Sequence, residues 1–161
     1  MASVTEAPRP RRLRPGDPAL AEALALVRAA FAYMDGVVDP PSSIHRLLDE
    51  AMEAAATDGE VWAAGDPVAA CVTLTPQQDA LNLGKLAVAE AARGRGLARL
   101  LVTHAEARAR ALALPRLRLQ SRTELVANHA TFAALGFVRV GATAHPGYAS
   151  PTSLTFEKEL P

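Results

Sequence analysis

A turn rich in glycine and arginine, Arg93-Gly94-Arg95-Gly96, separates two stretches with different hydrophobic periodicity. The stretch before it, Leu81–Val88, is typical of a strand, and residues 96–113 after it have the apolar spacing of an amphipathic helix. The first N–H groups of a helix lack partners within the helix and carry partial positive charge, so this turn is suited to binding a pyrophosphate. The two arginines add charge and forked donors. Taken alone, the turn is equally compatible with a simple connection whose arginines remain in water.

The first part of the chain predicts one short strand and two helices. A strand is expected around Arg11–Arg14, after an N-terminal tail of residues 1–10 that we expect to be flexible. Asp17-Pro18 is a favourable helix start, and an apolar stripe then runs to Met34, before Gly36. A second helix is expected from Ser42 or Ser43 to Gly59.

The remaining patterns alternate between strands and helices. Gly65-Asp66 has the composition of a hairpin turn. Two further helices are expected in this part of the chain, and they end at Pro115 and Gly136. The order predicts a mixed α/β layer in which an antiparallel part leads into a βαβ unit. The elements expected are strands at Glu60–Ala64, Pro67–Thr75 and Leu81–Val88, a helix at Gly96–Ala113, a strand at Arg116–Gln120, a helix capped by Thr123 and running to Leu135, and strands at Phe137–Gly141 and Thr152–Leu160.

Composition excludes several classes of protein. The chain has 17 basic and 17 acidic residues and only 4% aromatic residues, which disfavours a nucleic-acid-binding protein. No apolar run approaches the roughly 18 residues of a membrane span, and we expect no signal peptide. The single cysteine, Cys71, suits a reducing compartment, so the expected location is the cytoplasm. No His/Cys cluster has the spacing of a metal site, so no metal is expected. The length of 161 residues fits one domain, residues 1–161.

Two motifs together resemble those of the GNAT (GCN5-related) N-acetyltransferases. The first is Arg93-x-x-Gly96-x-Ala98, placed after Leu86-Ala87-Val88 and before the amphipathic helix. The second is a helix carrying Asn128 and Phe132 that closes with Leu135-Gly136-Phe137. The resemblance covers nearly the whole chain and implies the fold of that family. We therefore expect a central, mostly antiparallel, twisted sheet that is splayed between its fourth and fifth strands and flanked by about four helices.

The resemblance also implies that the chain binds acetyl-CoA as a co-substrate. The strand at Leu86–Val88 would pair with the pantetheine arm, and the turn after it would bind the pyrophosphate through backbone N–H groups. Asn128 would contact the pantetheine, and Phe132 would line the thioester end. The cofactor-binding residues implied in this way are Leu86, Ala87, Val88, Arg93, Gly94, Arg95, Gly96, Leu97, Ala98, Asn128 and Phe132.

The implied reaction is transfer of the acetyl group to a primary amine of a small molecule or peptide, by direct attack in a ternary complex. The backbone N–H near Val88 would stabilise the oxyanion on the thioester carbonyl. The departing thiolate can require a proton, which the family often obtains from a tyrosine four residues before the glycine of Leu-Gly-Phe. That position here is Phe132, which has no hydroxyl, so either another group gives the proton or none is needed, because a CoA thiolate is a fair leaving group. Tyr148 and Ser121 are the alternative catalytic candidates, with His145 beside them. Each residue also has a simpler interpretation. Tyr148 can pack its ring within its loop, Ser121 can cap the next helix, and His145 can lie in solvent.

The acceptor side is expected near the segment after the first helix and in the loop His145–Pro151. The candidate acceptor-binding residues are Asp35, Asp39, His45, His145 and Tyr148. For Asp35 and Asp39, turn formation and helix capping are the alternative roles. The departure at Phe132 also leaves open a non-catalytic acyl-CoA-binding domain of the same fold. Because strand edges in such folds often pair, a homodimer is one expected form, while neither nucleic acid nor a membrane is expected as a partner.

Overall fold

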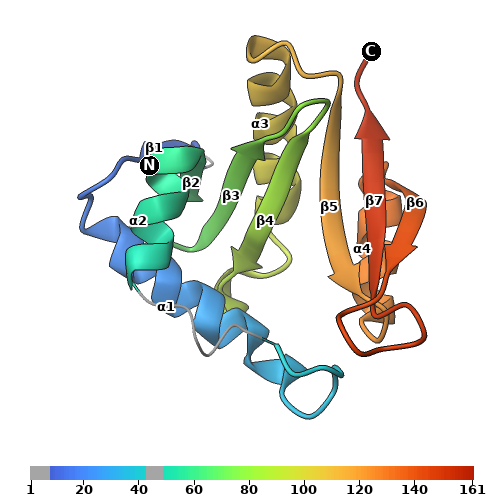
Figure 1. Cartoon of the computed structure of the whole chain (residues 1–161). Coiled ribbons are helices and arrows are strands. Elements are labelled where there is room, and N and C mark those ends of the chain that lie inside the picture. The colour runs from blue at the N-terminus through green and yellow to red at the C-terminus, as the bar shows by residue number, and fades with distance from the viewer. Residues whose placement is uncertain (1–7, 43–48) are drawn as a thin grey trace.

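The computed structural model describes residues 8–42 and 49–161 of the chain. Seven strands form one sheet in the order β1-β2-β3-β4-β5-β7-β6 (Figure 1). Neighbouring strands are antiparallel except β4 and β5, which are parallel. This mixed sheet confirms the expected fold class. The strands are β1 (Arg11–Leu13), β2 (Glu60–Ala64), β3 (Ala70–Pro76), β4 (Leu81–Val88), β5 (Arg116–Arg122), β6 (Val138–Thr143) and β7 (Ser153–Glu159).

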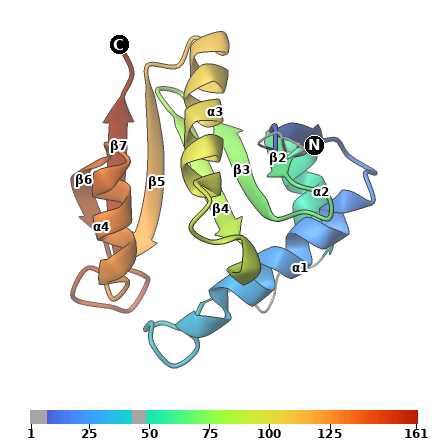
Figure 2. The same ribbon diagram turned by 180° about the vertical axis from the view of Figure 1, so that it is seen from behind.

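Helices cover both faces of the sheet. Along β2 and β3 consecutive residues belong to different apolar cores, because side chains alternate between the faces of a strand. Val72 and Leu74 pack in the core beneath α3, whereas Cys71 packs with α1 and α2. Figure 2 shows α3 and α4 in front of the strands. The α-helices of the described residues are α1 (Ala19–Phe31), α2 (Asp49–Asp58), α3 (Leu97–Ala111) and α4 (Val126–Ala134), and two short 3₁₀ helices are η1 (Ala32–Met34) and η3 (Glu90–Ala92).

The sheet opens between β4 and β5. Their register contains two pairs, Leu81 with Leu117 and Asn82 with Arg118, both at the starts of the strands. Beyond these pairs the two ribbons diverge toward their carboxyl ends (Figure 1). The splay expected between the fourth and fifth strands is therefore confirmed.

A β-bulge in β4 faces this opening. Cys71 pairs with Ala87 and Thr73 with Gly84, so one residue of β3 opposes Lys85 and Leu86 of β4. Lys85 has a φ of 48°, in the left-handed region that side-chain-bearing residues rarely adopt. The Cys71 thiol donates a 3.8 Å hydrogen bond to the Lys85 carbonyl. The bulge thus redirects the backbone of β4 just before the predicted cofactor-binding residues.

Three local expectations were wrong. The first apolar stripe is not one α-helix to Met34, because α1 ends at Phe31 and the chain tightens into η1, where the Asp35 N–H bonds the Ala32 carbonyl at 3.1 Å. Strand β3 begins at Ala70 and not at Pro67, since the Ala69 N–H bonds back to Ala64.

The third error concerns the start of α4. Thr123 does not cap this helix, because its N–H bonds the Thr152 carbonyl and its hydroxyl bonds Glu124. The helix begins three residues later, at Val126, without a side-chain cap. Ser43 and His45 lie outside the described residues. In the described part of the chain, no helix is both long enough and apolar enough to cross a membrane.

Candidate active site

A cavity of about 1010 Å³ occupies the opening between β4 and β5. Its walls come from β4, the turn into α3, β5 and α4, and the segment after α1 lies at its entrance. Ten of the eleven residues predicted to bind the cofactor line it, as does Ser121; Arg95 alone does not, and it projects from the same turn into solvent. The cavity-lining residues among these predictions are Leu86, Ala87, Val88, Arg93, Gly94, Gly96, Leu97, Ala98, Asn128, Phe132 and Ser121.

The turn into α3 presents unpartnered backbone N–H groups to one end of the cavity. Helix α3 starts at Leu97, directly after Gly96, and no side chain caps it. Gly94 and Gly96 have φ values of 80° and 75°, and a Cβ built on either meets no atom within 4 Å. The left-handed backbone, and not crowding, therefore requires glycine at both positions. With Arg93 beside it, this open turn has the donors and charge that fit a pyrophosphate group.

The β4 wall contributes a free strand edge. The Ala89 N–H donates to the Ala69 carbonyl at 2.8 Å, and Val88 pairs with Ala70 in the same antiparallel ladder. Because N–H groups in such a ladder alternate in direction, the N–H and carbonyl of Val88 point away from β3, toward the cavity. Strand β5 does not pair with this part of β4. The Val88 N–H is consequently placed to bond a ligand lying along the strand.

The opposite wall consists of β5 and α4. Phe132 packs its ring against Phe137 and Phe156, with centroid distances of 6.2 and 5.8 Å, and so closes the cavity toward the core. Asn128 lies one turn earlier on the same face of α4. Its side-chain amide donates a 2.9 Å hydrogen bond to the hydroxyl of Tyr33 in η1. Ser121 on β5 is buried and also lines this wall.

The two loops predicted to meet the acceptor are in contact with each other. The Tyr148 hydroxyl, from the loop between β6 and β7, donates a 2.6 Å hydrogen bond to Asp39, from the segment after η1. That bond raises the pKa of Tyr148. The Asp39 N–H donates to Glu124 at 2.7 Å, which lowers the pKa of the Glu124 carboxyl, and Arg122 donates to the carbonyl of Pro40. The segment is therefore anchored to the end of β5 that lines the cavity.

Among the described residues, none of the acceptor candidates lines the cavity. Asp39, Tyr148 and His145 are absent from the lining, as is Asp35, which is exposed in the turn after η1. The backbone N–H and the Nδ1 atom of His145 both contact the Thr152 hydroxyl, so the ring is held within its own loop. Within residues 8–42 and 49–161, no group of three His, Cys, Asp or Glu side chains is placed to hold a metal ion.

Sequence reasoning missed several polar residues of the cavity wall, and three of them carry the largest polar side chains. Tyr33 lies off the apolar stripe of its helix, Lys85 interrupts an apolar strand, and Arg122 follows the predicted end of its strand. The available signals were weak: the chain has only two tyrosines, and Lys85 is one of only two lysines. Neither composition nor periodicity shows which cavity a side chain reaches.

Comparison with known families identifies the scaffold. The model of the Acetyltransferase (GNAT) family matches residues 25–137, which include the cavity, the glycine turn and α4. The chain belongs to this family. This confirms the resemblance drawn from the two sequence motifs. No curated protein matches the chain significantly.

Solved structures support the same fold for this GNAT chain. The PaiA N-acetyltransferase of Thermoplasma acidophilum, in complex with coenzyme A, has a TM-score of 0.76 at 15% identity, covering 96% of this chain and 100% of that one. An acetyltransferase of Streptococcus agalactiae has a TM-score of 0.74 at 17% identity, with 97% and 100% covered. A GNAT acetyltransferase of Elizabethkingia anophelis with acetyl-CoA bound has a TM-score of 0.68 at 16% identity, with 97% and 100% covered.

Proposed function

We propose that this protein transfers an acetyl group from acetyl-CoA to a primary amine of a small molecule or peptide, by direct attack in a ternary complex. The observation that carries the proposal is the cavity between β4 and β5, which joins an uncapped helix start to an unpaired strand edge. Membership of the GNAT family and neighbours with CoA or acetyl-CoA bound support it.

The residues of the cavity divide the binding of acetyl-CoA between them. The turn from Arg93 to Ala98 would hold the pyrophosphate, with Arg95 contributing charge from the solvent side. The pantetheine would lie along Leu86–Val88, where the strand edge offers free backbone groups, and would reach Asn128 on the other wall. The Val88 N–H would donate to the thioester carbonyl oxygen as negative charge develops there.

The acceptor amine would enter beside the contact between Asp39 and Tyr148. A carboxylate at that entrance attracts an ammonium group, although Tyr148 already occupies one oxygen of Asp39. Asp35 and His145 remain candidates for contact with the acceptor, and His45 is a sequence-based candidate outside the described residues. The amine must lose its proton before it attacks, because only the neutral nitrogen has a free electron pair.

Thiol release with a matched pair of variants tests the proposal. The purified protein is incubated with acetyl-CoA and a panel of polyamines, amino acids, aminoglycosides and short peptides, and free CoA thiol is followed with a chromogenic disulfide. Gly96→Asp and Gly96→Asn are run beside the wild type, because both side chains tolerate a left-handed backbone and differ mainly in charge. We expect amine-dependent release that Gly96→Asp abolishes and Gly96→Asn weakens less. Failure of the wild type to bind acetyl-CoA in calorimetry would refute the proposal.

A second candidate is a non-catalytic acyl-CoA-binding domain of the same fold. The observation in its favour is Phe132. Its ring lines the α4 wall and packs against Phe137, and it has no exchangeable proton to give to a leaving thiolate. This alternative predicts acetyl-CoA binding that Gly96→Asp abolishes, together with no thiol release above background for any amine. The same samples therefore separate the two functions.

A further inference from the structure

Tyr33 brings a phenol hydroxyl to the wall of the cavity. Tyr33 lines the cavity and is 49% exposed. Its oxygen accepts the 2.9 Å hydrogen bond from Asn128, so the amide holds the oxygen and leaves the hydroxyl proton for another partner. The two residues are 95 positions apart in the chain and meet through packing alone.

The position of this hydroxyl matters because of Phe132. Asn128 and Phe132 are four residues apart on α4, both line the cavity, and residues at this spacing lie on one face of a helix. Through its bond to Asn128, Tyr33 therefore brings a phenol to the α4 wall that also carries the ring of Phe132, which has no proton to give. Met34, directly after Tyr33, packs against Leu125 at the start of α4 and fixes this segment there.

The other tyrosine is less suited to the same task. The Tyr148 hydroxyl donates its proton to Asp39, that bond raises its pKa, and the residue does not line the cavity. Ser121 lines the cavity, but an aliphatic hydroxyl is a far weaker acid than a phenol. The charged side chains that line the cavity with Tyr33 are Lys85, Glu90, Arg93 and Arg122. Of the three cations, the Lys85 ammonium is the alternative proton donor, because the guanidinium groups of Arg93 and Arg122 stay protonated in proteins.

We propose that Tyr33 gives its hydroxyl proton to the CoA sulfur as the thioester bond breaks. The inference rests on the proposed acetyl transfer. In this step the amine nitrogen bonds to the acetyl carbon, the carbon–sulfur bond breaks, and its electron pair leaves with sulfur, which takes the proton of Tyr33. The proton lost by the amine passes to water, and the phenolate recovers one from water. No oxidant, reductant or metal is consumed.

The test compares Tyr33→Phe with Phe132→Tyr in the same background. We expect Tyr33→Phe to lower kcat by at least about tenfold, toward the low end of general acid effects because a thiolate is already a fair leaving group. The fall in kcat at high pH that reports the ionisation of the donor should disappear. Calorimetric affinity for acetyl-CoA should change by no more than about twofold. Adding Phe132→Tyr should restore kcat, because it returns a phenol to the α4 wall.

Two further variants keep the result specific. Tyr148→Phe should raise KM for the acceptor and keep the fall in kcat at high pH. This result would separate the contact of Tyr148 with Asp39 from proton donation. If Lys85→Met, and not Tyr33→Phe, removes that fall, Lys85 is the donor and the inference is wrong. A wild-type enzyme with turnover and an unchanged Tyr33→Phe variant would overturn this inference alone. A wild type that releases no thiol with any amine would overturn the proposed function, and this inference with it.

Discussion

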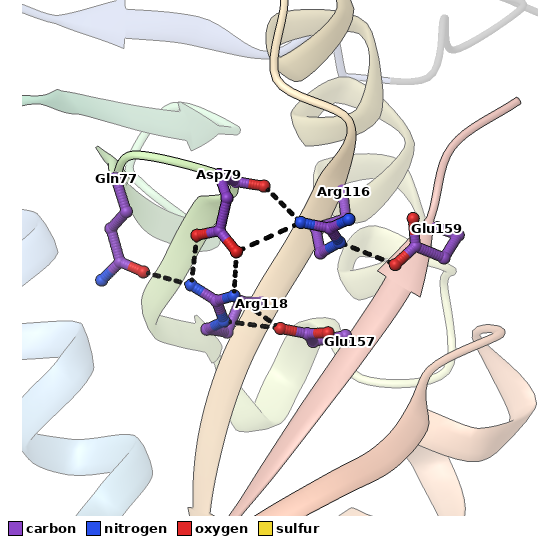
Figure 3. A network of polar contacts seen from close by, with 6 residues as sticks. All are labelled: Gln77, Asp79, Arg116, Arg118, Glu157 and Glu159. Carbon is purple, nitrogen blue, oxygen red and sulfur yellow. Dashed lines mark hydrogen bonds and ion pairs between the residues drawn. The ribbon is translucent and has the colours of Figure 1, made fainter.

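Arg118 of β5 and Asp79 of the turn between β3 and β4 form a two-point ion pair, with nitrogen–oxygen distances of 2.9 and 3.1 Å (Figure 3). Arg118 also bonds Glu157 of β7 at 2.7 Å, and Arg116 joins Asp79 to Glu159. These contacts surround the register pairs that hold β4 to β5. They therefore clamp the closed end of the splayed sheet, opposite the cavity's entrance.

Removing this clamp should loosen the two halves of the sheet. We expect Arg118→Leu to lower the melting temperature by about 2–4 °C or more, and by more than Arg116→Leu, because Arg118 is the less exposed arginine and holds the Asp79 carboxylate through two bonds where Arg116 has one. The measurement is thermal unfolding in low salt and in 1 M salt, where screening should reduce the difference. Equal melting temperatures for the two variants would show that Arg118 contributes no special constraint.

Stability should fall in two stages as the solution becomes acidic. The His104 ring packs against Trp62, and its Nε2 atom is buried without a hydrogen-bond partner among the described residues. Burial lowers the pKa of His104, and the positive charge of the nearby Arg108 lowers it further. Below the ordinary histidine pKa of 6.5, the unfolded chain therefore binds a proton at His104 that the folded chain does not bind. The free energy of unfolding consequently falls below about pH 6.5. Hydrogen bonds from Arg108 and Trp62 lower the pKa of Glu60, so its contribution is present above about pH 4.5 and lost below it.

Urea unfolding between pH 8 and about pH 3 measures both stages. His104→Leu should remove the first decline and keep the second. If the variant and the wild type lose stability in parallel from pH 6.5 downward, His104 is not the group responsible.

Cys71 should be chemically silent in the folded protein. It is 1% exposed, and burial raises the pKa of its thiol to about 12, so almost no thiolate exists at neutral pH. A chromogenic disulfide should therefore label no thiol in the native chain and one per chain in denaturant, with Cys71→Ala as the blank. Fast labelling of the native chain would mean that β3 and β4 separate readily. If Cys71 does not react in the folded protein, the protein also adds no thiol signal to the CoA-release assay.

The strained bulge offers a stability prediction. Lys85→Gly and Lys85→Ala remove the same charge, but only glycine adopts a φ of 48° without cost. A left-handed conformation costs a residue with a Cβ about 1–2 kcal/mol. Against this, glycine loses more conformational entropy on folding than alanine, which costs about 0.5–1 kcal/mol. We expect Lys85→Gly to be more stable than Lys85→Ala by about 0.5–1 kcal/mol in denaturant titrations. The reverse order would indicate that the bulge relaxes when the side chain is removed.

Much of the fold followed from patterns that act over a few residues. The spacing of apolar residues predicted α3 and the strands around it, and glycine at positions requiring a left-handed backbone marked the turn into α3. The same local chemistry places backbone donors at the start of α3, beside Gly96, so the position of these donors was predictable from the sequence. The errors at Thr123 and after Phe31 arose where a distant partner, or a tighter turn, replaced the expected local bond.

The contacts between segments that are distant in the chain depended on tertiary structure. Tyr33 and Asn128 are 95 residues apart, and Asp39 and Tyr148 are 109 apart, so no local rule connects them. Likewise the bulge at Lys85 exists because β3 and β4 pair out of step, a property of two strands together. The sequence by itself determined the order of the elements, the motifs of the family and the glycine turn into α3, since each depends on neighbouring residues. Only packing decided which loops meet over the cavity and which hydroxyl reaches its wall, because those contacts depend on how the elements are assembled.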